Sequence, residues 1–156
     1  KGRNLTVAQP TTTTITSSGD HSAYPCLVGR KYNFKYQFST FYARETKATG
    51  AGSTINAGRL QLKKIALIYG DSGYFEVTVA PLARTAGVYK FTGQILGSSS
   101  FILGTPFPDS GDFSVPIQCR NQDVVITIDN NSYLPSNFLS ADWTGIFSIL
   151  SARNVS

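Results

Sequence analysis

The chain has 156 residues, a formal net charge of +5, two cysteines and a single histidine. A length near 150 residues suits one domain with a substantial hydrophobic core, and no stretch of 18 apolar residues predicts a membrane-spanning helix. Two cysteines are too few for the disulfide framework of a small secreted protein, and the sequence leaves open whether Cys26 and Cys119 form a single bridge.

Positive charge is concentrated in the first half of the chain. Residues 1–78 hold ten Lys or Arg against four Asp or Glu, and residues 79–156 hold four against five, so the halves carry +6 and −1. A basic half suits contact with nucleic acid or with an acidic partner subunit, or it serves solubility alone. The candidate residues for contact with DNA or a partner are Arg59, Lys63 and Lys64.

Residues 1–23 include a Ser/Thr-rich run and are predicted to be an extended or flexible segment ahead of a β-rich domain at 24–156. The first clear strand covers 31–38, where four aromatic residues alternate with polar ones, as in a half-buried strand. Interleaved aromatics and lysines also occur on surfaces that stack bases, but buried aromatics and solvated lysines are the favoured interpretation. The four aromatics are Tyr32, Phe34, Tyr36 and Phe38.

Residues 59–80 are predicted to form a bent β-hairpin. Apolar residues alternate along 60–69 but change phase across Lys63 and Lys64, as a β-bulge requires. The turn signal Asp71-Ser72-Gly73 then precedes a second alternating segment.

Further short strands, each bounded by Gly, Pro, Asn or Asp, are predicted at 88–95, 113–118, 124–129 and 143–150. The loop-like stretches are 46–57, 97–100 and 104–111. Helix is expected to be scarce, apart from a turn near 135–139. About seven short strands with frequent turns predict an all-β fold, an antiparallel β-sandwich or barrel-like domain with long irregular loops and little helix.

The sequence offers no assembled motif for catalysis or metal binding. His21 is the only histidine, and adjacency to Asp20 and Ser22 does not make a catalytic triad. A zinc site needs about four ligands, which two distant cysteines and one histidine do not supply. Asp109 and Asp112 fit a polar turn better than a calcium site or a catalytic pair. We therefore predict a protein that is not an enzyme and needs no cofactor or metal.

Five segments attract attention through their order and spacing. They are GRLQL at 58–62, DSGYFEV at 71–77, FTGQILGSS at 91–99, GDFSVP at 111–116 and LPSNFLSADWTG at 134–145. Together they resemble the tail nozzle protein, also called tail tubular protein B, of short-tailed bacteriophages. The resemblance implies that these residues are the C-terminal region of a longer, β-rich virion protein that forms a hexameric ring in the phage tail, assembled in the bacterial cytoplasm.

The residues of these motifs that we interpret as scaffold are Gly58, Gly73, Gly93, Gly97, Pro135, Phe138, Trp143 and Gly145. Trp143, the only tryptophan, is predicted to be largely buried. Pro135 is expected to reverse the chain and so place Phe138 against the core.

The function that the resemblance implies is a structural part of the nozzle ring, the conduit for DNA ejection. The implied partners are other copies in a hexamer, the tail adaptor protein, tail fibres, the translocating double-stranded DNA and the host cell surface. One alternative is a carbohydrate- or receptor-binding β-sandwich at the tail tip, and a less favoured one is a cell-wall-degrading tail enzyme. The 156-residue chain alone is expected to be a monomer or weak oligomer, with exposed strand edges at 59–80 as the place where copies pair.

Overall fold

The computed structural model describes residues 7–8, 14, 16–20, 22–23, 31–46, 52–55, 58–93 and 108–149. Every regular element in these residues is a strand. The strands are β1 (Val7–Ala8), β2 (Thr16–Ser17), β3 (Phe34–Gln37), β4 (Arg44–Thr46), β5 (Gly52–Thr54), β6 (Gly58–Ser72), β7 (Tyr74–Pro81), β8 (Gly87–Thr92), β9 (Asp109–Arg120), β10 (Val124–Asn130) and β11 (Phe138–Ile149). The predicted all-β class is confirmed. The predicted helical turn near 135–139 is wrong, because β11 already begins at Phe138.

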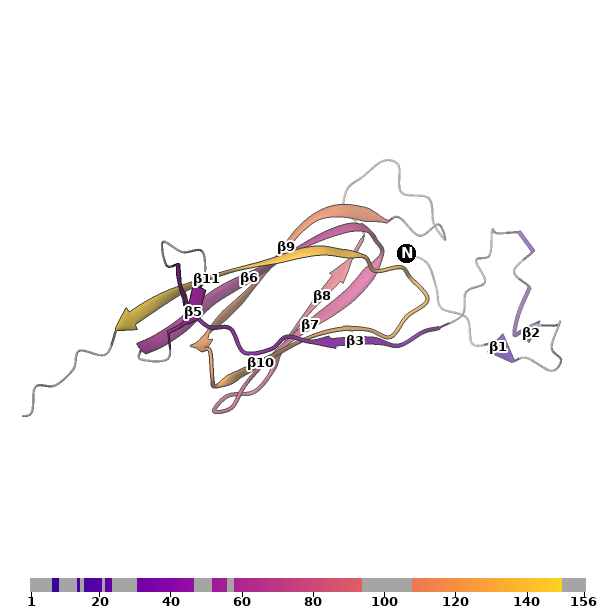
Figure 1. The fold of residues 1–156 in the computed structure, drawn as a ribbon. Coiled ribbons are helices and arrows are strands. Elements are labelled where there is room, and N and C mark those ends of the chain that lie inside the picture. The colour runs from indigo at the N-terminus through magenta and orange to yellow at the C-terminus, as the bar shows by residue number, and fades with distance from the viewer. Residues whose placement is uncertain are drawn as a thin grey trace, which may run out of the picture.

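Two antiparallel sheets form the body of the fold (Figure 1). One sheet has the strand order β3-β10-β7-β8 and the other has the order β11-β6-β9. Both sheets contribute to one hydrophobic core, so the domain is the predicted β-sandwich and not a closed barrel. Two short hairpins, β1–β2 and β4–β5, pair separately, and the second of them occupies part of the predicted loop at 46–57.

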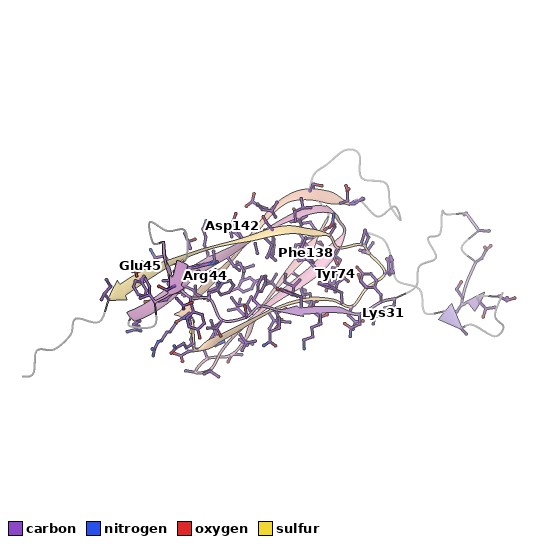
Figure 2. All side chains as sticks on the ribbon, in the orientation of Figure 1. Lys31, Arg44, Glu45, Tyr74, Phe138 and Asp142 are labelled. Atoms are coloured by element: carbon purple, nitrogen blue, oxygen red, sulfur yellow. The ribbon has the colours of Figure 1, made fainter. Side chains whose placement is uncertain are left out.

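The core is built by alternate residues of β6, β7, β9 and β10, as a half-buried strand requires. Its buried apolar members are Leu60, Leu62, Ile65, Leu67, Tyr69, Phe75, Val77, Val79, Val115, Ile117, Ile126 and Ile128. Phe75 has no exposed surface, and its ring centroid lies 4.7 to 5.5 Å from four other aromatic rings. Figure 2 shows the side chains that fill the space between the sheets.

The predicted bulge in the strand at 59–69 is confirmed. The extra residue of β6 appears against β11, where Leu62 pairs with Gly145 and Lys64 pairs with Thr144, so Lys63 has no partner of its own. On the other side of β6, two residues of β9 oppose Lys63. One of these two residues has a left-handed φ of 48°. The extra residue Lys63 explains the change of phase along β6, because the apolar residues on both sides of it reach the same core.

The predicted hairpin at 59–80 is wrong in its pairing. β6 pairs with β9 and β11, whereas β7 pairs with β8 and β10, so the turn is an arch that carries the chain from one sheet to the other. Asp71 has a φ of 46°, and its amide donates to Ser110 Oγ at 2.9 Å. The buried Gly73 donates its amide to the Pro135 carbonyl at 2.8 Å. These turn amides bond to other segments and leave the two flanking strands free to separate.

Candidate nucleic-acid interface

The outer face of the β11-β6-β9 sheet carries the candidate contact residues at one end. Arg59 and Lys64 alternate with buried residues of β6, and both are exposed. The bulge adds the exposed Lys63 directly beside Lys64. The three cations predicted from the sequence therefore lie along one end of a single strand.

Strand pairing brings a fourth cation to this group. Arg120 at the end of β9 is exposed and pairs with Gln61, which lies between Arg59 and Lys63 on β6. We call the four residues Arg59, Lys63, Lys64 and Arg120 the basic patch. Sequence reasoning missed Arg120, because only the β6–β9 register shows that it lies beside the other three.

No carboxylate neutralises the basic patch among the described residues, where one ion pair forms, between Lys90 and Glu76 of the other sheet. The acidic residues of the same outer face lie further along it. Asp142 of β11 pairs with Ala66, and Asp112 of β9 pairs with Ile68. The face is thus basic at one end and acidic at the other.

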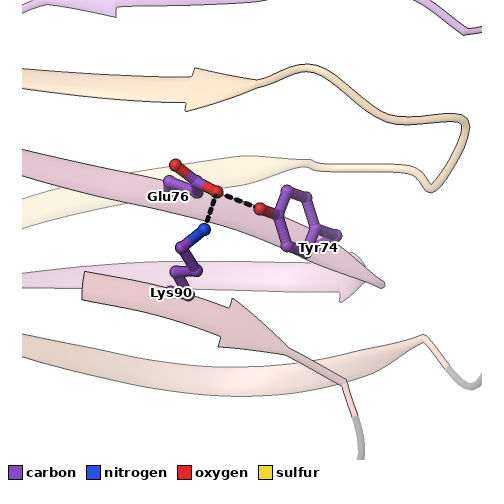
Figure 3. A network of polar contacts seen from close by, with 3 residues as sticks. All are labelled: Tyr74, Glu76 and Lys90. Atoms are coloured by element: carbon purple, nitrogen blue, oxygen red, sulfur yellow. Dashed lines mark hydrogen bonds and ion pairs between the residues drawn. The ribbon is translucent and has the colours of Figure 1, made fainter. Parts of the chain in front are cut away.

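The outer face of the β3-β10-β7-β8 sheet is different, because its charges alternate in a balanced row. Strand register places Lys35 opposite Asp129, Asp129 opposite Glu76, and Glu76 opposite Lys90. Lys90 Nζ lies 2.9 Å from Glu76 Oε1, which also accepts a hydrogen bond from the Tyr74 hydroxyl (Figure 3). Two positive and two negative charges cancel, so this row offers no net attraction for a polyanion.

These contacts shift two pKa values in opposite directions. The hydrogen bond from Tyr74, followed by the one from Lys90, holds the pKa of Glu76 below its usual range. Burial, followed by the hydrogen bond to Glu76, raises the pKa of Tyr74 to about 12.

We expect the stability of the domain to depend on these groups at both ends of the pH scale. The contribution of Tyr74 is present below its ordinary pKa of 10.0 and is lost as the pH rises towards about 12. The contribution of Glu76 is present above the ordinary carboxyl pKa of 4.5 and is lost as the pH falls through its lowered value. Denaturant unfolding across pH measures both; Tyr74→Phe should flatten the alkaline loss, and the exposed Tyr133→Phe should not.

Trp143 is not buried as predicted: 36% of its surface is exposed. It does face the interior, since it pairs with the fully buried Ile65 and its ring lies 5.6 Å from Phe41. The burial prediction fails because β11 is an edge strand of its sheet, and no strand in the described part of the chain covers the far side of the indole.

The aromatic residues at 32–38 were also predicted to be buried, and they too are partly exposed. Tyr36 pairs with the buried Ile128, so the predicted inward phase is correct, yet 50% of Tyr36 is exposed. The ring centroids of Phe34 and Phe138 of β11 lie 5.9 Å apart, and the two rings are stacked. The favoured interpretation of these aromatics as core residues is therefore wrong for the most exposed of them. Together with Trp143 they line what we call the open side of the sandwich, bounded by β3 and β11.

At two of the predicted scaffold positions, close neighbours explain why the residue is glycine. A Cβ on Gly145 would lie 2.7 Å from the Gln61 carbonyl oxygen, and one on the buried Gly73 would lie 3.1 Å from Leu134 Cβ. Gly93 donates its amide to the Gly73 carbonyl at 3.0 Å. Any side chain at Gly145 or Gly73 therefore requires neighbouring backbone or side chains to move.

Other predictions for the scaffold have varied outcomes. Phe138 packs half-buried against the core after the Pro135 reversal, as predicted. Gly58 lies against the Phe147 ring. Gly97, like Cys26 and His21, lies outside the described residues. Cys119 is a free thiol whose sulfur lies 3.6 Å from the Asp123 carbonyl oxygen.

A buried polar network fixes the connection between β10 and β11, and no sequence signal predicted it. Asn130 has no exposed surface, and its Nδ2 lies 2.7 Å from Tyr32 Oη, 2.9 Å from the Leu134 carbonyl and 3.1 Å from Ser136 Oγ. Its Oδ1 accepts hydrogen bonds from the amide and hydroxyl of Ser132 at 3.0 and 2.7 Å. One side chain thus holds the loop that carries Pro135.

Comparison with known proteins places the chain in a family. The sequence profile described as bacteriophage nozzle protein matches residues 2–154. The chain belongs to this family. It is also 28% identical over 128 residues to the tail tubular protein gp12 of Escherichia phage T7, an alignment that covers 82% of this chain. The chain spans 16% of the length of that relative.

The described residues contain no helix long and apolar enough to cross a membrane. Nor do they bring three or more His, Cys, Asp or Glu side chains together in a group that holds a metal ion. Among the described residues, the exposed cations of the basic patch are the group that suits contact with a polyanion.

Proposed function

We propose that the chain is a structural part of a bacteriophage tail nozzle, a virion ring that forms the conduit for DNA ejection. The match of nearly the whole chain to the nozzle family carries this proposal. The alignment with a tail tubular protein supports it. A β-sandwich whose two sheets share one hydrophobic core suits a structural element of such a ring.

In this proposal the ring contains six copies, which meet the tail adaptor protein and tail fibres and surround the translocating double-stranded DNA. A closed ring requires two different patches on each subunit, which meet between neighbours. Because the chain spans 16% of its relative, it supplies only part of each contact. Imaging the complete parent protein in a virion tests this arrangement, and density for this sandwich outside a six-fold tail ring contradicts it.

The basic patch is the surface that we assign to DNA. The four cations are exposed and have no carboxylate partner in the described part of the chain. Such cations bind phosphate oxygens by releasing condensed counterions, and this binding does not depend on base sequence. Weak contact without base recognition suits a conduit, since DNA must slide past the protein. The balanced charge row on the other sheet offers no comparable attraction.

We expect the chain to bind mixed-sequence duplex DNA weakly at low salt, with affinity that falls steeply as salt rises. Removing both charges in Lys63→Gln/Lys64→Gln should reduce the slope of log affinity against log salt by about 2, and Arg120→Gln should reduce it by about 1. Fluorescence anisotropy of a labelled duplex across salt concentrations provides the measurement.

The matched control is Lys31→Gln/Lys35→Gln, which removes the same net charge from exposed lysines outside the basic patch. This double variant should keep the slope of the unmodified chain. Equal losses in the two double variants would assign binding to net charge rather than to the patch, and affinity that is independent of salt would contradict the mechanism.

The exposed aromatics do not favour the carbohydrate-binding alternative. Tyr36 and Trp143 point toward the space between the sheets at the open side, and they do not form a platform on an outer sheet face. The proposal also retains the prediction that the chain is not an enzyme. Release of peptidoglycan or capsule fragments by the purified chain would contradict that prediction.

A further inference from the structure

β11 is an outer strand with unusual composition. It is 12 residues long, pairs only with β6 among the described strands, and carries a single charge, at Asp142. Leu139, Ile146 and Ile149 are 66%, 50% and 77% exposed along it. A long, apolar outer strand with unpaired backbone groups is a template for pairing with another strand.

The other outer strands have features that discourage such pairing. β3 has four residues and carries Lys35, and β8 has six residues and carries Lys90. β9 is as long as β11, but it contains Pro116 and three charged residues. Short length, charge and proline are the usual means of blocking edge-to-edge association. The expected pairing edge at 59–80 is wrong, since β6 and β7 are both flanked by neighbours.

We propose that the free edge of β11 binds a second copy of this chain, by antiparallel pairing with β11 of that copy. Directly opposed residues of antiparallel strands share a face. A two-fold axis at Thr144 therefore sets Trp143 opposite Gly145 and Asp142 opposite Ile146. The Trp143 indole of each copy then covers Gly145 of the other copy, and an aromatic side chain opposite a glycine is known to stabilise sheets. The Asp142 carboxylates of the two copies do not oppose each other.

The size of the contact sets its strength. Twelve residues of strand extend about 40 Å. One sheet layer is about 10 Å thick, so the edge of β11 offers a contact area of about 400 Å² per copy. The total of about 800 Å² is below the roughly 1,200 Å² of stable complexes. The pair must therefore dissociate on dilution. The inference does not rest on the proposed ring, which a two-fold contact alone cannot build.

Sedimentation across a range of concentrations, read together with Trp143 emission, tests the pairing. Dimer should appear as concentration rises, and emission should shift to shorter wavelength in step because pairing covers the only indole. Ile146→Asp places a carboxylate opposite Asp142 at two points, so the dissociation constant should rise at least about tenfold. Val88→Asp on β8 is the matched control, since Val88 is also 50% exposed on an outer strand, and it should change the constant by less than about twofold.

Hydrogen exchange gives a readout without mutation: protection of the amides at 138–149 should rise with concentration while that of 87–92 stays constant. A chain that remains monomeric at every concentration overturns the proposal. So does dimerisation that leaves Trp143 emission and β11 exchange unchanged, or that Val88→Asp weakens as much as Ile146→Asp. Loss of DNA binding in the basic-patch variants, with dimerisation intact, would separate this inference from the proposed function.

Discussion

Replacing Phe75 with alanine is expected to lower the free energy of unfolding by about 3–5 kcal/mol. Phe75 is fully buried on β7, and its ring contacts Tyr69 of β6, Phe91 of β8, Phe113 of β9 and Phe138 of β11. These rings come from both sheets, so the cavity left by the substitution lies between the layers. Chemical denaturation followed by circular dichroism measures the change.

The control for this substitution is Leu82→Ala in the turn after β7. Leu82 is 78% exposed, so its truncation should change stability by less than about 0.5 kcal/mol. If Phe75→Ala lost no more stability than Leu82→Ala, the two sheets would not share the core described above.

The inside and outside of most strands could be predicted from alternation alone. The change of phase at Lys63 and Lys64 predicted a bulge, and the pairing of β6 with β11 shows one at Lys63. This success has a local cause: side chains alternate with period two, so burial of one face is visible within a few residues. The arch between β6 and β7 was not predictable in the same way. A turn at Asp71 to Gly73 is visible in sequence, but whether the flanking strands pair depends on distant strands that compete for the same edges.

The second incorrect prediction concerns the burial of aromatic side chains at the edges of the sandwich. It too failed because a local pattern does not report which strands are neighbours. Tyr36 points inward as the alternation at 31–38 predicted, and Trp143 also points inward, yet both remain exposed because they lie on outermost strands. Alternation reports the face of a strand and not its position in the sheet. A lone tryptophan is therefore a weaker signal of burial than its size suggests.

The candidate site was partly predictable for a related reason. Arg59, Lys63 and Lys64 are neighbours in sequence and stay neighbours on β6. Arg120 joins them only through the register of β6 with β9. Asn130 is harder still to recognise, because an asparagine before a loop looks like an ordinary turn residue. Its partners come from the segment before β3 and from the loop before β11.

The hydrogen-bond network of Asn130 is the basis for the second large predicted loss of stability. Replacing Asn130 with leucine, which is similar in size, is expected to lower the free energy of unfolding by about 3 kcal/mol, because it removes five hydrogen bonds and leaves two part-buried donors without an acceptor. The Leu134 carbonyl keeps only its bond from Tyr32 Oη, at 2.8 Å, and the amide and hydroxyl of Ser132 lose their acceptor. A core of apolar contacts alone would accept the leucine; a loop held by hydrogen bonds does not.

The adjacent Asn131 provides the control, since it is exposed and Asn131→Ala should change stability by less than about 0.5 kcal/mol. Asn130→Asp separates the two halves of the network. Its carboxylate keeps the acceptor for Ser132, but its second oxygen faces the Leu134 carbonyl oxygen, which cannot donate a hydrogen bond, and the substitution buries a charge. We therefore expect Asn130→Asp to be at least as destabilised as Asn130→Leu at neutral pH and to recover stability in acid, where the protonated carboxyl donates one hydrogen bond. Denaturant unfolding at both pH values decides the matter: an Asn130→Leu variant as stable as Asn131→Ala would show that the loop before β11 is held by packing instead.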